Sequence, residues 1–503
     1  MSVLAKNITY NILGQGIVVM LGFVAVKFIY SSLGADALGI IYFSFLINSV
    51  LFGILEKGIY STTVREISKN IHTDKEYSEK LIQTGTMITW GAFFLFVIIV
   101  YLLVPLFVEK WITFSFMKQE EVVVSLQILA LSSLVAFPTS FYASLLRGIQ
   151  RMGYTNIIDV VLTAIQQIGI LVVINYSGDF IHVVIWIATS YMLKLAAYFS
   201  VCTKFFTIKS FLPIYSKTVI ERNSKFTVNM IYMSILAMIY KQSDKLALSK
   251  LQPVGVLGYY GFAYNAISKA TMLTMSISNA AYPSLCELSE EADKPKLMER
   301  YRVLQELMLF INVPIFFSIV YASLPLFEFV FDSNVSEKLF YPTIILCLGF
   351  YINGSLSLPY RLVLAKGKSE IAVKQDLYAL LFILPFVIFL VFQFGITGAA
   401  SGLLLYMIFG CFYMIPRLYR ECIFERSGEF YILLIKMLIL AFISYGLIFV
   451  FMYNFYAMEV INILVAYCIA SILFLIMSFS SMSKVLKKKL VAQLNSASKF
   501  ILR

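Results

Sequence analysis

Lysines inside apolar stretches are the side chains of this sequence best suited to chemistry at membrane depth. The run 226–249 is long enough to cross a bilayer as a helix, yet it contains Lys241, Asp244 and Lys245. Each charge at this depth costs about 2.5–3.5 kcal/mol on insertion scales. Ser234, Lys241 and Lys245 are separated by nearly whole helical turns and share one face. That face must contact protein or water, where its ammonium groups are suited to an anionic ligand.

Two structural roles for these charges compete with ligand binding. The aliphatic stems of Lys245 and, less easily, of the deeper Lys241 can carry their ammonium groups to the membrane interface. Asp244 can also neutralise Lys241, which lies one turn away on the same helix. Even with that pair formed, the three side chains keep one net positive charge.

Further lysines occur in other apolar runs, at Lys27, Lys194, Lys269 and Lys436. Lys269 lies well inside the predicted span 257–284, and an ion pair with Asp244 is its structural alternative. For Lys194 and Lys436 we expect snorkelling near a membrane interface.

A cleft lined by fixed positive charges suits a phosphate, because a phosphate entering a medium of low dielectric needs cationic partners. The residues that we expect to line it are Lys27, Lys241, Lys245 and Lys269. Asp244 is the candidate for coupling transport to a proton or another cation.

Neutral polar residues recur at helical spacing and are candidates for contacts with a sugar. Asn7, Asn11 and Gln15 form one stripe, and Asp159 and Gln166 belong to another. The structural alternative is hydrogen bonding between neighbouring helices.

The elements that hold these residues are membrane-spanning helices. The sequence is 60% hydrophobic and 14% charged, whereas soluble domains carry about 25% charged residues. It predicts an all-α polytopic membrane protein with about 14 spans. The predicted spans are 8–31, 37–58, 82–108, 122–146, 154–175, 180–203, 226–249, 257–284, 304–331, 339–363, 371–393, 397–416, 431–452 and 458–481.

Charge in the connecting loops predicts the orientation. Lysine and arginine gather in alternate loops, and the opposite loops hold only Lys110, Lys118 and Lys338, with Lys250 at the rim. The excess of basic residues marks the cytoplasmic side, so we expect both termini inside a bacterial cytoplasmic membrane. The net charge of +12 therefore reflects topology, and we expect no nucleic-acid partner.

The sequence contains no recognisable metal, cofactor or nucleotide site. His72 and His182 are far apart, without a cysteine or carboxylate cluster beside them. Gly367-Lys368-Ser369 lacks the earlier glycine of a phosphate-binding loop. We expect no cofactor and a transport process driven by an ion gradient, the membrane potential or consumption of the product.

An internal repeat divides the predicted spans into two sets of six. Lys27 precedes a Leu38-Gly39-x-x-x-Phe43 motif, and Lys245 precedes Leu257-Gly258-x-x-x-Phe262. Parallel repeats are typical of transporters that bind substrate between two halves. We predict lobes at 1–217 and 218–425, followed by two extra helices and a basic tail at 426–503.

Several longer stretches resemble the polysaccharide-transporter branch of the multidrug/oligosaccharidyl-lipid/polysaccharide (MOP) exporter superfamily, which includes the O-antigen flippases. They are SSLGADALGIIYFSF, LEKGIYSTTVREIS, ASLLRGIQRMGYTNII, DKLALSKLQPVGVLGYYGFAYNAIS and LAKGKSEIAV. The resemblance implies two six-helix lobes around a central cleft. It also implies flipping of an undecaprenyl-pyrophosphate-linked repeat unit to the outer leaflet by alternating access. Glu56 stands where the family often has Asp, which leaves the role of that carboxylate open.

Other functions stay in competition with this interpretation. A flippase for the lipid-linked peptidoglycan precursor also needs a basic cleft, whereas a cation or drug antiporter of the same superfamily would need acidic cavity residues. A membrane glycosyltransferase or polymerase would need acidic catalytic residues in a sizeable loop, and these loops are short. We expect a non-enzymatic, monomeric transporter whose partners are a polyprenyl-linked glycan, membrane lipids and a glycan polymerase or ligase.

Overall fold

The secondary structure is helical, and the described part of the chain holds one isolated β-bridge, between Thr113 and Pro253. This computed structural model describes residues 3–488 except 56–58, 72, 116, 291–293 and 456–458. Side chains are described over the same ranges except at 3–13, 15, 52–55, 225–226, 229–230, 232–233, 236–237, 240 and 290. The helices pack into two compact units, Met1–Phe262 and Ala263–Arg503, with the boundary inside helix α9.

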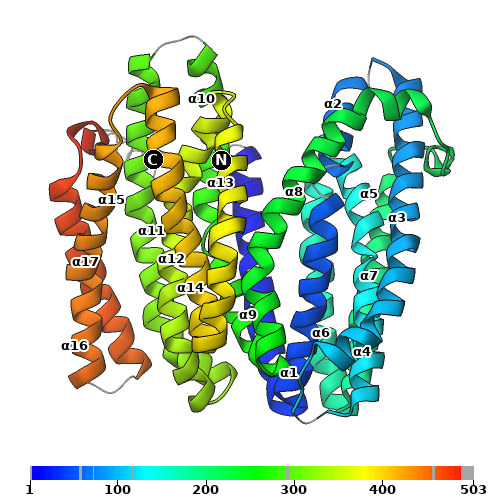
Figure 1. Cartoon of the computed structure of the whole chain (residues 1–503), viewed down its shortest axis with the longest axis horizontal. Helices are drawn as coiled ribbons and strands as arrows, with labels where there is room; N and C mark the ends of the chain where they lie inside the picture. Colours follow the sequence, from blue (N-terminus) through cyan, green and yellow to red (C-terminus); the bar gives the residue numbers. More distant parts are fainter. Residues whose placement is uncertain are drawn as a thin grey trace. The chain divides into compact units, whose positions relative to one another are not determined.

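The first unit is a bundle in which long helices run side by side (Figure 1). Its elements are α1 (Val3–Leu55), α2 (Ser61–Asn70), α3 (Lys75–Lys110), α4 (Gln119–Ser133), α5 (Ala136–Gly148), α6 (Met152–Ser177), α7 (Phe180–Cys202), η2 (Ile208–Phe211), α8 (Lys217–Leu251) and the first part of α9 (Val254–Lys269). Phe137, Phe141 and Tyr198 are fully buried between these helices. Phe94, Leu95 and Ile98 on α3 are more than half exposed, as expected for side chains that face lipid.

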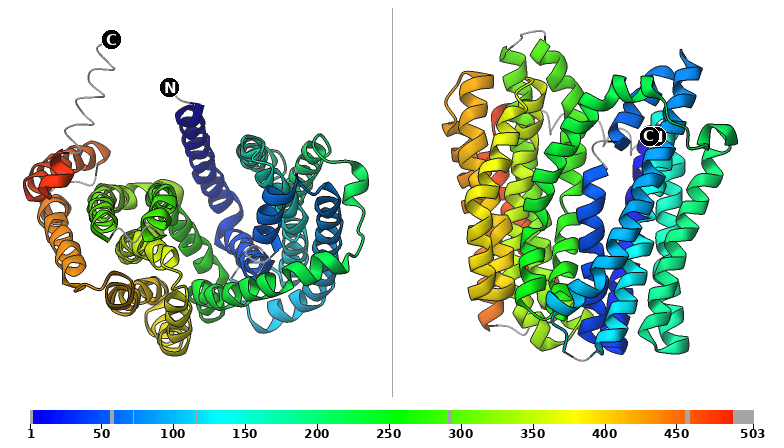
Figure 2. Two further views of the ribbon diagram at one scale, coloured as in Figure 1. Left: turned by 90° about the horizontal axis from the view of Figure 1, so that it is seen from above. Right: turned by 45° about the vertical axis from the view of Figure 1, so that its right-hand side comes forward.

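The second unit is also a bundle, and Figure 2 shows the helices of each unit end on. After the end of α9 it comprises α10 (Met272–Glu290), α11 (Lys294–Val330), α12 (Ser333–Ala365), α13 (Glu370–Tyr378), η3 (Ala379–Ile383), α14 (Leu384–Leu418), η4 (Tyr419–Ile423), α15 (Gly428–Ala441), η5 (Phe442–Gly446), α16 (Leu447–Phe455) and α17 (Val460–Ser481). Helices α11, α12 and α14 form its centre, where α12 packs against both neighbours. Buried aromatic side chains, including Tyr321, Tyr445 and Phe474, join α11 to α15–α17.

The helices confirm a multi-pass membrane protein. Ten helical segments in the described chain are long and apolar enough to span a membrane. Two of these segments each contain two predicted spans, because Gly34 (φ 85°) and Gly395 (φ 54°) break the helical backbone within them. The predicted spans 226–249 and 257–284 correspond to the charged helix α8 and to α9 with α10. Within the described residues, each of the fourteen predicted spans overlaps one or two of these helices.

The expected lobe boundary at 217/218 and the packing boundary at 262/263 rest on different criteria. The first comes from the repeated motifs, whereas the second reflects which helices pack together. Helix α8, which would begin the second repeat, packs against α1, α2 and α3 in the first unit. The division of the chain into repeat-based lobes stays a prediction.

The two Leu-Gly motifs of the repeat meet where α1 crosses the start of α9. A Cβ atom at Gly39 would lie 2.1 Å from the carbonyl oxygen of Val254. A Cβ atom at Gly258 would lie 2.8 Å from the backbone nitrogen of Gly39. Glycine at these two positions lets the helix backbones approach closely, as small residues do between membrane helices.

We predict that Gly39→Ala lowers the stability of the purified protein. The added methyl group overlaps a carbonyl of α9, and overpacking of this kind typically costs about 1–3 kcal/mol. Thermal unfolding in detergent, followed by tryptophan fluorescence, measures the effect. Gly16→Ala on the same helix is the matched control, because a Cβ atom there meets nothing within 4 Å. Equal melting temperatures for the two variants would contradict the close crossing.

Candidate functional site

Asp244, Lys245 and Tyr260 form a buried polar cluster in the first unit. Asp244 and Lys245 are neighbours on α8 and are 5% and 9% exposed. The Lys245 ammonium donates to the two Asp244 carboxylate oxygens at 3.3 and 3.4 Å. The Tyr260 hydroxyl, from the start of α9, donates to Asp244 Oδ2 at 2.7 Å. One carboxylate therefore neutralises Lys245 and ties α8 to α9.

The other lysines of the predicted cleft are less buried. Lys241, one turn before Lys245 on α8, is exposed, and Lys27 on α1 is half-buried. Lys27, Lys241 and Lys245 carry three positive charges and Asp244 one negative charge, so α1 and α8 have an excess of positive charge at these positions. The snorkelling that we considered for Lys245 does not describe it, because its ammonium is held at a buried carboxylate.

Lys269 lies in the second unit, and its position differs from the sequence-based expectation. We placed it well inside one continuous helix, but α9 ends at Lys269 and the chain turns at residues 270–271 before α10 begins. The amides of Ala270 and Thr271 donate to carbonyl oxygens three residues back, which tightens this helix end. Lys269 is exposed there, and a cation is favourable beside the terminal carbonyls of a helix.

One side chain of the polar stripe on α6 contacts the neighbouring helix α7. The carboxylate of Asp159 pairs with the Lys194 ammonium at 2.7 Å. The backbone carbonyl oxygen of Gln166 accepts a hydrogen bond from the Trp186 indole at 3.0 Å. The interhelical alternative to sugar binding is thus present at the side chain of Asp159, and the role of the Gln166 side chain stays a prediction. The side chains of Asn7, Asn11 and Gln15 lie outside the described residues, as do Glu56 and His72.

The Asp244 cluster buries a lysine ammonium beside a carboxylate. The charge of Asp244 compensates that of Lys245, which offsets the cost of burying the ammonium. A phosphate carries more charge and more acceptor oxygens than a carboxylate and is therefore a second kind of partner that suits this ammonium.

A second buried carboxylate, Glu66, was not predicted from the sequence to have a functional role. It lies on α2, its side chain is 4% exposed, and it contacts Arg65 at 2.9 Å and Arg222 of α8 at 3.3 Å. The Tyr77 hydroxyl of α3 donates to Glu66 at 3.1 Å and accepts from the Asn223 amide at 2.8 Å. This network joins the beginning of α8 to α2 and α3. One sequence feature drew attention to Glu66. Glu66-Ile67-Ser68 corresponds to Glu287-Leu288-Ser289 in the second copy of the predicted repeat.

The other end of α8 is held to the end of α3. The Trp111 indole donates to the Ser249 hydroxyl at 3.1 Å. The Lys250 ammonium donates to the Lys110 carbonyl oxygen and lies 5.5 Å from the Trp111 ring centroid. Helix α8 is thus fixed at both ends to the first unit, and this fixes the position of its buried Asp244.

We predict that Arg222→Ala increases amide exchange in the first turns of α8. The variant removes an ion pair between buried Glu66 and half-exposed Arg222, and ion pairs with an exposed partner are worth about 0.2–1 kcal/mol. Hydrogen–deuterium exchange mass spectrometry of residues 217–228 measures this change. Glu221→Ala is the control, because its exposed carboxylate pairs with the exposed Lys217 of the same helix, at 3.6 Å. Unchanged exchange in Arg222→Ala would show that the Arg222–Glu66 pair does not anchor α8.

Comparison with known protein families gives a match over the first part of the chain. The family described as "Polysaccharide biosynthesis protein" matches residues 4–289. A protein of Shigella flexneri named "Putative O-antigen transporter" is 20% identical over 403 residues, which cover 78% of this chain and 93% of that protein.

Solved structures show a similar fold over most of the chain. The lipid II flippase MurJ in an inward closed conformation aligns with a TM-score of 0.73 and 17% identity, over 96% of this chain and all of that chain. An inward-facing multidrug resistance MATE family transporter of the MOP superfamily aligns with a TM-score of 0.63 and 13% identity. That alignment covers 80% of this chain and 94% of the transporter.

Proposed function

We propose that this chain, which belongs to the polysaccharide biosynthesis protein family, flips an undecaprenyl-pyrophosphate-linked oligosaccharide repeat unit from the inner to the outer leaflet. The protein is a non-enzymatic membrane transporter with the fold of the MOP superfamily. The name of the Shigella flexneri relative supports an O-antigen or similar glycan as cargo. Alternating access between two conformations is the expected mechanism for such a fold.

The observation that carries this proposal is the buried ammonium of Lys245. A lysine in a spanning helix is expensive unless it has a partner or a function, and the ammonium of Lys245 is buried beside the carboxylate of Asp244. The excess of lysine on α1 and α8 supports an anionic headgroup over a cationic drug. We place the pyrophosphate at Lys27, Lys241 and Lys245 of the first unit, and we assign to Asp244 the coupling to a proton or another cation. A contact of Lys269 with the substrate stays a prediction from the sequence.

The peptidoglycan precursor is the second candidate substrate, because the lipid II flippase shares the fold over nearly the whole chain. Both substrates present a pyrophosphate to the protein, so the lysines do not separate them. Deletion of the gene, followed by mass spectrometry of the accumulated lipid-linked intermediate, identifies the substrate. Accumulation of lipid II would exclude the oligosaccharide repeat unit.

We predict that a Lys245→Gln, Asp244→Asn double variant folds but no longer transports. Replacing both partners keeps a neutral, similarly shaped pair, which avoids the penalty of about 3–5 kcal/mol for leaving one buried charge unpaired. Surface glycan should fall by about tenfold or more, as expected for loss of a charge-assisted contact to phosphate. Precursor should accumulate on the inner leaflet, while the amount of protein in the membrane stays normal.

The control for this experiment is Lys217→Ala on the same helix, since the Lys217 side chain is 78% exposed. It should leave surface glycan unchanged. Normal surface glycan in the double variant at normal protein abundance would refute a transport role for this charge pair.

We also propose that both termini lie in the cytoplasm, as the distribution of basic residues indicates. A green fluorescent protein fused after Arg503 should fluoresce, whereas an alkaline phosphatase fused at the same position should be inactive. Active phosphatase at that position would reverse the orientation and the direction of transport that we propose. On this topology, a glycan polymerase or ligase would receive the flipped product on the outer side.

A further inference from the structure

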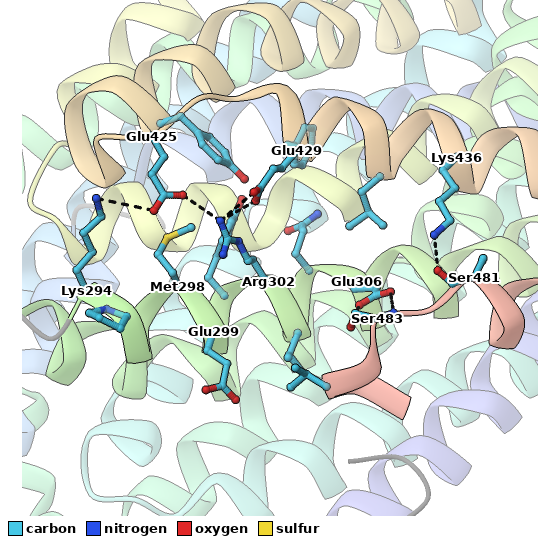
Figure 3. Close-up of a pocket in the computed structure, with 18 residues that line it drawn as sticks. Lys294, Met298, Glu299, Arg302, Glu306, Glu425, Glu429, Lys436, Ser481 and Ser483 are labelled. Carbon is cyan, nitrogen blue, oxygen red and sulfur yellow. Dashed lines mark hydrogen bonds and ion pairs between the residues drawn. The ribbon is translucent and has the colours of Figure 1, made fainter. Parts of the chain in front are cut away.

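A large polar cavity lies in the second unit. The residues that line it are far from the Asp244 cluster in the sequence. It has a volume of about 820 Å³ and lies between the first half of α11, the beginning of α15 and the chain that follows α17 (Figure 3). Its basic lining residues are Lys294, Arg302 and Lys436, and its acidic ones are Glu299, Glu306, Glu425 and Glu429. A ligand that fills this cavity therefore meets both signs of charge.

The charges are held in place by contacts that leave them facing the cavity. Arg302 contacts Glu425 at 3.0 Å and Glu429 at 2.8 Å, so its guanidinium joins the segment after η4 to α15 (Figure 3). Glu306 is buried and accepts hydrogen bonds from the Ser483 amide and hydroxyl at 2.8 and 2.5 Å. These contacts fix the positions of the charged groups before a ligand arrives.

Two lysines at the ends of the cavity can take an additional acceptor. The Lys436 ammonium donates to the Ser481 carbonyl oxygen, and Lys294 lies 3.8 Å from Glu425. Each ammonium has three donor hydrogens. A phosphate can therefore join the contacts of either lysine without displacing them.

The lengths of the helices place this cavity at the level of the lipid headgroups. Helix α11 has 37 residues and is therefore about 55 Å long. The hydrocarbon core of a bilayer is only about 30 Å thick. The charged beginning of α11, from Lys294 to Glu306, extends beyond that core, while the apolar remainder crosses it.

An apolar groove follows the polar cavity along the same helices. It has a volume of about 370 Å³ and is lined by Val313, Phe316 and Phe317 on α11 and by Leu438, Phe442 and Val450 on α15–α16 and η5. Val313 comes seven residues, or about two turns, after Glu306 on α11. Phe442 and Val450 are 60% and 52% exposed. The groove is thus open on one side at a depth where the surroundings are acyl chains.

We propose that the cavity and the groove together form a binding site for one zwitterionic glycerophospholipid, with an ethanolamine headgroup. Its phosphate would bind Lys436, which lies on α15 beside the groove, its ammonium the cavity carboxylates, and one acyl chain the groove. Three basic and four acidic residues line the cavity, so an anionic headgroup would meet a net negative wall. A lipid that carries both charges matches the lining, and the cavity has the size of an ordinary small-ligand pocket.

Native mass spectrometry of the full-length protein in detergent tests this proposal. The protein is titrated with phosphatidylethanolamine, phosphatidylglycerol and undecaprenyl phosphate, and bound lipid is counted on the intact chain. We expect one tightly retained phosphatidylethanolamine, favoured over phosphatidylglycerol by about tenfold, as expected for one additional charge-assisted contact. Equal retention, or preference for phosphatidylglycerol or undecaprenyl phosphate, would overturn the assignment.

Two pairs of variants locate the bound lipid. Lys436→Ala should weaken retention by about tenfold through loss of a phosphate contact, whereas exposed Lys374→Ala, outside the cavity, should not. Val450→Trp should close the groove and reduce retention, whereas Val465→Trp, on an exposed part of α17, should leave it unchanged. If control and test variants behave alike, the lipid does not occupy this site. Because lipid retention is measured on purified protein, this result does not depend on the proposed transport activity.

Discussion

The structure depends on one constraint, namely that a charge in an apolar helix must find a partner or water. Helix α8 carries Asp244 and Lys245 into the buried interior of the first unit, and each satisfies the other. Tyr260 adds the hydrogen bond that makes the pair a link between two helices. A neutral ion pair of this kind contributes little net stability compared with apolar residues.

The same constraint explains why α8 is held so firmly at its ends. Its first turns are joined to buried Glu66 through Arg222, and its last turn is joined to Trp111 through Ser249. These contacts lie where the helix leaves the apolar region, so they can use charged groups at lower desolvation penalty. They set the height and rotation of α8 in the first unit. The buried pair is thereby positioned by polar contacts at the two ends of α8.

Much of the fold was predictable because its signal is local. Twenty apolar residues predict a spanning helix regardless of the partners, and the breaks near Gly34 and Gly395 were expected between predicted spans. The break after Lys269 was missed, since no glycine or proline marks it. For the site, the sequence identified the charged residues of α8 but not the Lys245–Asp244 pairing. A side chain one residue away usually points elsewhere on a helix, so helical spacing did not predict that the Lys245 ammonium lies beside Asp244.

Contacts between helices far apart in the sequence could not be predicted from the spacing of apolar and charged residues. The Glu66 network and the polar cavity of the second unit each join helices far apart in the sequence. In the sequence, their charged residues resemble the loop residues that determine membrane topology. Net charge alone does not show whether such a residue determines topology or joins two helices. Lys194 illustrates this ambiguity, because snorkelling was expected and the structure gives it an ion pair with Asp159.

In the predicted repeat, Lys27 and Lys245 lie at the same distance from the ends of their helical segments. Lys27 lies seven residues before the backbone break at Gly34, and Lys245 lies seven residues before Gln252, where α8 ends. Each lysine is thus about two turns, or roughly 10 Å, from the point where its helix is interrupted. Beyond these points the Leu-Gly motifs of both copies pack against one another at Gly39 and Gly258. Because that crossing admits no side chain, it holds the backbones of α1 and α9 close together just beyond both interruptions. On the predicted repeat, the two lysines therefore occupy equivalent positions along α1 and α8.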